Sequence, residues 1–297
     1  MKRISFLLIA AAGILWGSMG LFVRTLNTAG LETMDIVFLR ALVTGAGMLG
    51  YLAICKPSLL KIRLRDFWCF LGTGIASIVF FNFCYFRAIT LTSLSVAAVL
   101  LYTAPAMVMV MSWFLFKEAL TGRKIIALVM TVAGCVLVTG VLKEGNTLTA
   151  GGILLGLGAG FGYALYSIFT RYALERGYHS LTITCYTFLI AAAAAVPLSH
   201  PGFVMQAAFS SWGMGAFSLA FGLLCTVAPY LLYTIGLKYT DNSKASILAS
   251  VEPVTAAVLG VIVFHESLTA MTVLGMVLVL AGMAVCSSRT KREKTSV

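Results

Sequence analysis

Long apolar stretches separated by short polar loops run along the whole chain. An α-helix rises 1.5 Å per residue, so about 20 apolar residues are needed to cross the hydrocarbon core of a bilayer. Ten stretches reach roughly this length, at residues 4–23, 34–54, 67–86, 94–116, 123–142, 150–170, 181–199, 213–236, 245–264 and 271–288. The pattern therefore predicts an all-α integral membrane protein with ten transmembrane helices.

The second half of the chain repeats the first half at a distance of 148 residues. Within residues 85–134, 14 of the 50 positions carry the same amino acid as the position 148 residues later. The recurring residues include Pro105 with Pro253 and Glu118 with Glu266. Each copy holds five predicted helices, and because five is odd, the second copy must enter the membrane from the opposite side. The sequence therefore predicts two inverted five-helix repeats, an architecture typical of secondary transporters.

Basic residues are distributed unevenly between the two sets of loops. The termini and the even-numbered loops carry 17 of the 21 lysines and arginines, the odd-numbered loops carry three, and Arg40 lies inside a span. Because cytoplasmic loops are rich in lysine and arginine, both termini are expected in the cytoplasm and the protein in the inner (plasma) membrane of the cell. This orientation also accounts for the formal net charge of +11, so nucleic-acid binding is not expected.

The amino-acid composition supports an integral membrane protein. Hydrophobic residues make up 60% of the chain and charged residues only 10%, against about 25% charged residues in soluble domains. The seven cysteines form no CxxC pair and are interpreted as small packing residues.

The first apolar run continues to Phe22, which favours a spanning helix over a signal peptide. The sequence has no P-loop and no HExxH motif, which argues against an ATP-driven pump unless a separate subunit supplies the ATPase activity. We expect no metal and no cofactor.

Two charged residues lie well inside predicted spans. Arg40 lies roughly 10 Å into the second span by helical rise, where a charge is costly unless it is paired or faces water. It is interpreted either as a cation for an anionic or zwitterionic substrate, or as an arginine that reaches a membrane face or backbone carbonyls. Glu252 precedes Pro253, which removes one helical hydrogen bond. A carboxylate in such a place can bind and release protons, so Glu252 is a candidate for proton coupling or amine binding, or else a structural partner at a kink.

Aromatic residues with a polar tip interrupt several spans. Trp16 and Tyr163 occupy matching places in the first helices of the two repeats. Such residues can line an amphipathic cavity, although most membrane aromatics pack or lie in interfacial belts. Asn82 is a weaker candidate, because it lies near the end of its predicted helix. The candidates for substrate binding are therefore Arg40, Trp16, Tyr102, Tyr163, Asn82 and Tyr230.

Residues that recur in both repeats are expected to build the scaffold rather than to bind substrate. Glu118 and Glu266 each follow the fourth helix of a repeat, where turn and helix-end hydrogen bonds are expected. Pro105 and Pro253 recur inside the fourth helices themselves. The residues expected to cap the following helices are Thr121 and Thr269.

The chain resembles the drug/metabolite transporter superfamily, and within it the EamA-type ten-helix exporters. The resemblance rests on Leu15-Trp16-Gly17-Ser18, Arg40, Thr103-Ala104-Pro105-Ala106, Phe116-Lys117-Glu118-Ala119-Leu120, Val251-Glu252-Pro253-Val254 and Phe264-His265-Glu266-Ser267-Leu268. It implies one EamA-type repeat over residues 1–145, a second over residues 146–289, and a basic cytoplasmic tail over residues 290–297. It also implies a secondary transporter, driven by protons or by exchange, that moves a small organic metabolite such as an amino acid, commonly outward.

Other functions stay open at this stage. The superfamily that the chain resembles includes carriers of nucleotide sugars and of lipid-linked solutes, and competition by free amino acids would separate these from an amino-acid carrier. A receptor or a membrane subunit without transport activity is a second alternative. A membrane enzyme is a third, but no cluster of His, Asp or Ser supports it. The sequence leaves open the solute, the direction of transport, the coupling ion and whether the chain forms a homo-oligomer.

Overall fold

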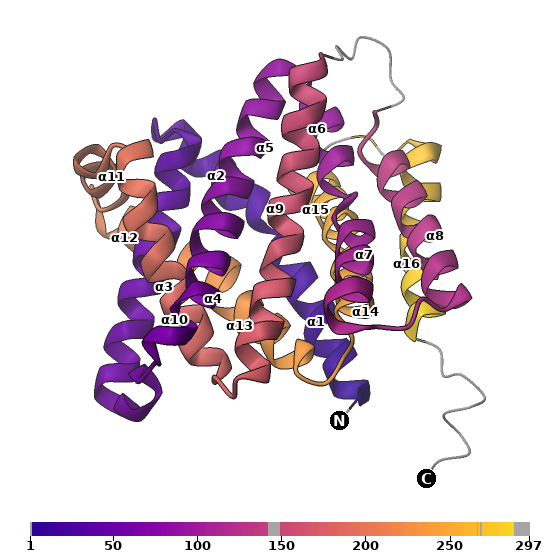
Figure 1. Ribbon diagram of the computed structural model, residues 1–297. Coiled ribbons are helices and arrows are strands. Elements are labelled where there is room, and N and C mark those ends of the chain that lie inside the picture. The colour runs from indigo at the N-terminus through magenta and orange to yellow at the C-terminus, as the bar shows by residue number, and fades with distance from the viewer. Residues whose placement is uncertain (1, 142–148, 266, 268, 288–297) are drawn as a thin grey trace.

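The computed structural model describes residues 2–141, 149–265, 267 and 269–287 as a bundle of helices (Figure 1). No strand occurs in this part of the chain. Nine helical segments within it are long and apolar enough to cross a membrane. The fifth predicted span coincides with α8 (Gly122–Val138), which has 17 residues and falls just short of the length of the others. The nine are Ile4–Thr28, Thr33–Cys55, Leu64–Leu91, Leu94–Phe116, Ala150–Glu175, Ser180–Leu198, Trp212–Leu237, Asn242–Phe264 and Ala270–Ser287.

Several of these segments consist of shorter helices that follow one another. In the first half they are α1 (Lys2–Gly17), α2 (Met19–Thr28), α3 (Thr33–Cys55), α4 (Phe67–Leu71), the π-helix η3 (Gly72–Val79), α5 (Phe80–Leu91), α6 (Leu94–Leu101) and α7 (Ala104–Phe116). In the second half they are α9 (Ala150–Glu175), α10 (Ser180–Ala195), α12 (Trp212–Gly222), the π-helix η5 (Leu223–Val227), α13 (Ala228–Leu237), α14 (Asn242–Ala249), α15 (Glu252–Phe264) and α16 (Ala270–Ser287). The segment Leu64–Leu91 begins with η2 (Leu64–Asp66), and the segment Ser180–Leu198 ends with η4 (Val196–Leu198). The loops contain η1 (Pro57–Leu60) and α11 (Pro201–Ala208).

The fourth span of each half is interrupted at its middle, between α6 and α7 and between α14 and α15. Pro105 is the second residue of α7, and Pro253 is the second residue of α15. The sequence predicted that Pro253 removes one helical hydrogen bond and left a kink open, and the structure places a break between two helices there. Proline instead begins a new helix, because the first N–H groups of a helix have no partner within it.

The same two spans also end in matching ways. Lys117 after α7 and His265 after α15 both adopt a left-handed conformation, with φ of 53° and 54°. Their backbone N–H groups donate to the carbonyls of Ser112 and Gly260, which closes the last turn of each helix. The predicted caps of the next helices are confirmed. Thr121 Oγ1 accepts from the N–H of Lys124 at 3.4 Å, and Thr269 Oγ1 accepts from that of Thr272 at 3.1 Å.

Contacts between the two halves occur in corresponding sets. The helix α1 packs against α13, α14 and α15, and its counterpart α9 packs against α5, α6 and α7. The second helices α3 and α10 pack against each other, as do the fifth helices α8 and α16, which lie side by side in Figure 1. These contacts of the first, second and fifth helices therefore correspond between the two halves.

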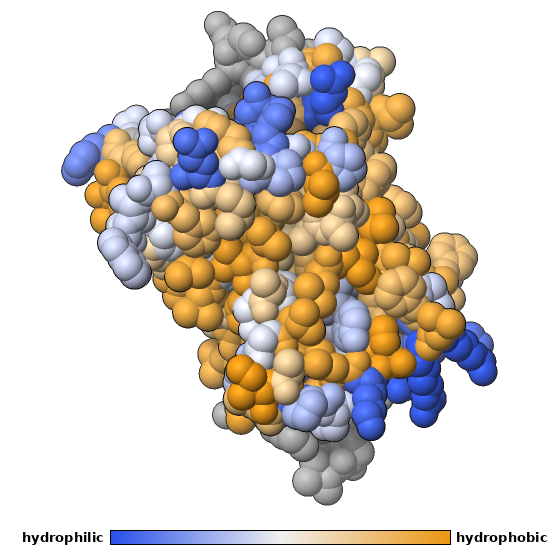
Figure 2. Space-filling model, turned by 90° about the vertical axis from the view of Figure 1, so that its left-hand side faces the viewer, coloured by the Kyte–Doolittle hydropathy of each residue, from blue (hydrophilic) through white to orange (hydrophobic). Residues whose placement is uncertain are grey.

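Hydrophobic side chains cover the middle of the surface. Figure 2 shows an orange band of apolar residues across this face, with hydrophilic residues gathered toward its upper and lower ends. Large apolar side chains such as Leu154, Ile262 and Phe114 are more than half exposed. A soluble protein rarely exposes a continuous apolar band of this kind, whereas a bilayer provides the matching solvent.

The pair α8 and α16 depends on glycine at its crossing point. A Cβ atom on Gly275 would lie 2.6 Å from the carbonyl oxygen of Gly134, a distance too short for a side chain. Close approach of this kind drives helix association in lipid. We expect Gly275→Val to reduce the yield of monodisperse protein strongly in size-exclusion chromatography. A Cβ on Gly47 in α3 would meet no atom within 4 Å, so Gly47→Ala is the matched control. Equal yields of both variants would contradict this packing.

Candidate functional site

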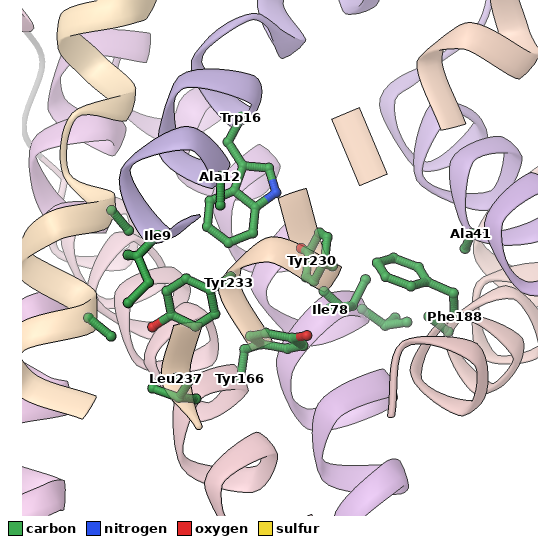
Figure 3. Close-up of a cluster of buried hydrophobic side chains, with 14 of the residues drawn as sticks. Ile9, Ala12, Trp16, Ala41, Ile78, Tyr166, Phe188, Tyr230, Tyr233 and Leu237 are labelled. Carbon is green, nitrogen blue, oxygen red and sulfur yellow. The ribbon is translucent and has the colours of Figure 1, made fainter. Parts of the chain in front are cut away.

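Aromatic side chains from both halves surround a small cavity in the centre of the bundle. Trp16 and Tyr163 lie at the middle of their spans, and their ring centroids are 6.4 Å apart. The Trp16 ring also lies 5.1 Å from that of Tyr230 and 5.4 Å from that of Tyr233. Figure 3 shows Trp16, Tyr230, Tyr233 and Tyr166 arranged around a common space. The cavity has a volume of about 20 Å³ and is lined by Trp16, Ser77, Ile78, Phe81, Tyr163, Tyr166, Ser167, Tyr230 and Tyr233.

Hydrogen bonds hold two of these tyrosines in place. The hydroxyl of Tyr233 lies 2.7 Å from that of Ser167, and the hydroxyl of Tyr166 lies 3.0 Å from that of Thr234. The indole Nε1–H of Trp16 is buried and has no hydrogen-bond partner among the described residues. An unpaired buried donor costs roughly 1–3 kcal/mol. This donor belongs to a residue that lines the cavity.

Arg40 is buried beside this cavity without a carboxylate partner. Its side chain is 3% exposed. One terminal nitrogen donates to Asn82 Oδ1 at 3.4 Å and the other lies 3.4 Å from Met19 Sδ, while Nε has no partner within the described part of the chain. No acidic oxygen of the described residues lies within 4.0 Å of this guanidinium. A buried charge whose described partners are neutral is poorly compensated.

Asn82 orients this arginine from the neighbouring third span. Its Nδ2 donates to the carbonyl of Ile78 at 2.7 Å, which leaves Oδ1 directed at Arg40. The prediction that Asn82 lies near a helix end was wrong. The third span continues to Leu91, and Asn82 is 5% exposed in its interior. The reason is that Phe86, Arg87 and the residues after them extend the helix beyond the apolar run.

Glu252 lies at the interruption of the ninth predicted span, as the first residue of α15. The hydroxyl of Tyr163 donates to its Oε2 at 3.2 Å. The positive end of the helix dipole also favours a carboxylate at this position. A second cavity of about 10 Å³ adjoins it, and Tyr163 lines both cavities. Its lining residues are Leu101, Tyr102, Ala104, Pro105, Tyr163, Ser246, Ala249, Ser250 and Glu252.

Glu118 lies outside this site, in a buried polar cluster at one end of the bundle. Its carboxylate accepts from the N–H groups of Asn242 and Ser243, at 2.7 and 3.2 Å, and from the Ser243 hydroxyl at 2.6 Å. Lys124 lies 3.4 Å and Arg171 4.0 Å from the same carboxylate. We call these five residues the Glu118 cluster. Its members Lys124, Arg171 and Ser243 were not predicted, because they come together only through tertiary packing.

Further bonds surround the Glu118 cluster. Arg171 donates to the carbonyls of Leu237 and Thr240, at 3.2 and 2.7 Å. Asp241 lies 3.2 Å from Lys124 and 3.7 Å from Lys244. Burial acts to raise the pKa of Asp241, but the two ammonium groups outweigh it and hold that pKa below its ordinary value. Glu266, the counterpart of Glu118, lies outside the described residues.

The predicted substrate-binding residues come together in space. Trp16, Tyr163 and Tyr230 line the first cavity, Tyr102, Tyr163 and Glu252 line the second, and Arg40 and Asn82 lie beside the first. Ser77, Phe81, Tyr166, Ser167 and Tyr233 belong to the same wall but were not among the predicted site residues.

Comparison with known proteins identifies the family. The sequence profile of the EamA-like transporter family matches residues 3–140 and again residues 150–288. The chain belongs to the EamA-like transporter family. The predicted membership of the drug/metabolite transporter superfamily is thereby confirmed. This EamA-like transporter is a multi-span membrane protein that moves a small-molecule solute, and its family consists of transporters, not enzymes.

Relatives of this EamA-like transporter match over most of its length. An uncharacterized transporter of Archaeoglobus fulgidus is 31% identical over 282 residues, which cover 93% of the chain and 94% of that protein. The uncharacterized transporter YwfM of Bacillus subtilis is 27% identical over 98% of the chain and 95% of its own length. The threonine/homoserine exporter RhtA of Escherichia coli is 28% identical over 86% of the chain and 83% of its own length. A protein of known crystal structure has the same fold, with a TM-score of 0.81 at 19% identity over the full length of both chains.

Proposed function

We propose that this EamA-like transporter is a secondary carrier that exports a zwitterionic metabolite, an amino acid or a related solute. The observation that carries the proposal is a buried arginine without an acidic partner, beside an aromatic cavity that also adjoins a carboxylate. Arg40 would bind the carboxylate of the solute, the aromatic rings its apolar part, and Glu252 its amine or a coupled proton. The similarity to the threonine/homoserine exporter RhtA supports this class of solute.

We further propose ten spans that form two inverted repeats, with both termini in the cytoplasm. The corresponding contacts of α1 and α9, and the self-pairing of α3 with α10 and of α8 with α16, support a pseudo-two-fold axis between the halves. Interrupted fourth spans in both halves support it as well, because carriers build their solute sites at such breaks. In this arrangement α8 is the fifth of the ten spans, and the charge bias of the loops sets the orientation.

The size of the central cavity supports alternating access. Pockets for small organic molecules commonly measure about 300–1,000 Å³, whereas the central cavity measures about 20 Å³. The helices around it must therefore separate before a solute can enter. By the charge bias, the Glu118 cluster lies at the cytoplasmic end of the bundle. There it joins the loop after α7 to the first residues of α14, so separation toward the cytoplasm requires it to break.

The importance of the Glu118 cluster can be tested by removing its carboxylate. Glu118→Ala would leave Lys124 and Arg171 buried without their acceptor, and breaking such a pair costs about 3–5 kcal/mol. We expect the melting temperature of the purified protein to fall by several degrees in scanning fluorimetry. Glu175→Ala removes the same charge from the exposed end of α9 and serves as the control. A melting temperature for Glu118→Ala equal to that of Glu175→Ala would rule out this role.

Transport of the proposed solute class can be measured with purified protein in liposomes. We expect saturable counterflow of radiolabelled L-threonine, with competition by other free amino acids. UDP-glucose and an undecaprenyl phosphate serve as competitors for the alternative classes of carrier. If L-threonine shows no counterflow but radiolabelled UDP-glucose or undecaprenyl phosphate does, the proposal is replaced by a nucleotide-sugar or lipid-linked solute.

A further inference from the structure

The contact between the second and third spans has opposite chemistry in the two halves. Asn82 and Tyr230 occupy equivalent positions 148 residues apart, and the position of Arg40 corresponds to Thr187 or Phe188. In the first half, Arg40 donates to Asn82 at 3.4 Å. In the second half, the rings of Phe188 and Tyr230 meet edge to face, with centroids 4.8 Å apart and planes at 86°. The same contact between the second and third spans is therefore polar in one half and aromatic in the other.

One member of each pair, Asn82 or Tyr230, follows the same backbone feature. The π-helix η3 ends at Val79, three residues before Asn82, and η5 ends at Val227, three residues before Tyr230. Short π-helical segments inside α-helices occur frequently at functional sites, because they change the direction in which the following side chains point. The occurrence of one in each half, at matching positions, indicates that both segments direct a side chain toward the centre.

The two pairs lie at the wall of the same cavity. Tyr230 lines it directly, and Asn82 lies one helical turn after Ile78, which lines it as well and whose backbone carbonyl accepts from Asn82. Figure 3 shows Phe188 beside Tyr230, with Ala41, the neighbour of Arg40 in the chain, next to Phe188. The helices that carry Arg40 and Phe188 approach closely at Gly45, where a Cβ atom would lie 2.9 Å from the backbone nitrogen of Leu189. One solute can therefore meet both pairs.

We propose that these two pairs determine the orientation and the specificity of the solute. Arg40 binds its anionic group, with Asn82 as a positioning residue, and Tyr230 supported by Phe188 receives its apolar substituent. The inference rests on the proposed amino-acid carrier and adds the residues that distinguish one side chain from another. The reverse orientation is unfavourable, because the face of an aromatic ring carries a partial negative charge and the guanidinium would remain without a counter-charge.

The polar pair is tested with Asn82→Asp, which supplies a carboxylate to Arg40 from within the protein. We expect the variant to melt at a higher temperature than the wild type when no solute is added. We also expect the affinity for L-alanine, L-threonine and L-leucine to fall by about ten-fold or more, since a charged hydrogen bond of the solute is lost. Asn82→Gln keeps the amide and is the control for shape. A lower melting temperature for Asn82→Asp than for Asn82→Gln, together with unchanged affinities, would overturn the proposal.

The aromatic pair is tested with Tyr230→Asn, which gives the second half the residue found at the equivalent position of the first. In counterflow, we expect the KM for L-leucine to rise by roughly ten-fold relative to the KM for L-alanine, as apolar contacts discriminate to about this extent. Tyr230→Phe retains the ring and should keep the wild-type order of the two KM values. An equal rise of both KM values in Tyr230→Asn would overturn the role in specificity.

These measurements separate the inference from the function on which it rests. If the wild type transports none of the three amino acids, the proposed solute class is wrong. The melting temperature of Asn82→Asp without solute then still decides whether Arg40 is an available cation. A melting temperature above that of the wild type would retain the polar pair as an anion site for a different carboxylate. A melting temperature below that of the wild type would reject the polar pair.

Discussion

Arg40→Ala is expected to reduce the transport of an anionic or zwitterionic solute by roughly 10- to 100-fold, the largest effect that we predict. A hydrogen bond to a charged group contributes about 1.5–3 kcal/mol, and each 1.4 kcal/mol changes an equilibrium constant about ten-fold. Arg40 is suited to this role because it is buried and its described partners are the neutral groups of Asn82 and Met19. The loss should appear mainly as a higher KM in counterflow.

Two further variants show whether the effect belongs to this position. Arg40→Lys keeps the charge but loses the planar fork that binds a carboxylate through two hydrogen bonds, so it should transport at an intermediate rate. Arg87→Ala removes an exposed arginine from the end of the third span and should leave the rate unchanged. Wild-type transport by Arg40→Ala would show that the buried guanidinium serves only the packing of α3.

Glu252→Gln is expected to uncouple transport from a proton gradient. Gradient-driven uptake should fall by roughly ten-fold or more. Glutamine retains an oxygen that can accept from Tyr163, so the hydrogen bond at 3.2 Å is preserved in kind. It cannot bind and release a proton, however. Uptake should be measured in proteoliposomes with and without a pH gradient, alongside counterflow, which needs no coupling ion. We expect counterflow to persist and the response to the gradient to disappear.

Tyr163→Phe is the matched control for that prediction. It removes the hydroxyl that donates to Glu252 but leaves the carboxylate in place, so the response to the gradient should be weakened and retained. A Glu252→Gln variant that accumulates solute in response to the gradient as well as the wild type does would exclude Glu252 from coupling. Loss of counterflow in the same variant would instead assign Glu252 to binding of the amine.

The membrane spans could be predicted from sequence because hydropathy alone decides where a helix can lie in lipid. Nine of the predicted spans coincide with the nine apolar segments found, and the remaining one coincides with α8. The interruptions of the fourth spans could not be placed in this way. A proline in an apolar run is compatible with a kink or with the start of a new helix, and only the backbone around Pro105 and Pro253 decides between them.

The candidate site was predictable where a residue is unusual in its surroundings. Arg40 and Glu252 stand out because charges are costly in the membrane interior. The carboxylate of Glu118 was expected to accept hydrogen bonds from a turn or a helix end. It does bind a helix end, which is the N-terminus of α14, more than 120 residues further along the chain. In the sequence, Tyr166 and Tyr233 cannot be told from aromatic residues that only pack in the core. Their position around the cavity distinguishes them. Contacts between segments far apart in the chain are set by packing, on which local sequence carries no information.

The contacts of α1 constrain how the protein is made. Its Ser5 hydroxyl lies 2.7 Å from that of Thr240, 235 residues later in the chain. Its Gly13 and Gly17 leave no room beside Ala249 and Glu252 for a side chain. At about 5–20 residues per second, a ribosome needs roughly 10 to 50 s to make the chain between them. During synthesis the first helix therefore waits in the bilayer without its partners, and assembly is completed only after the last third of the chain has been inserted.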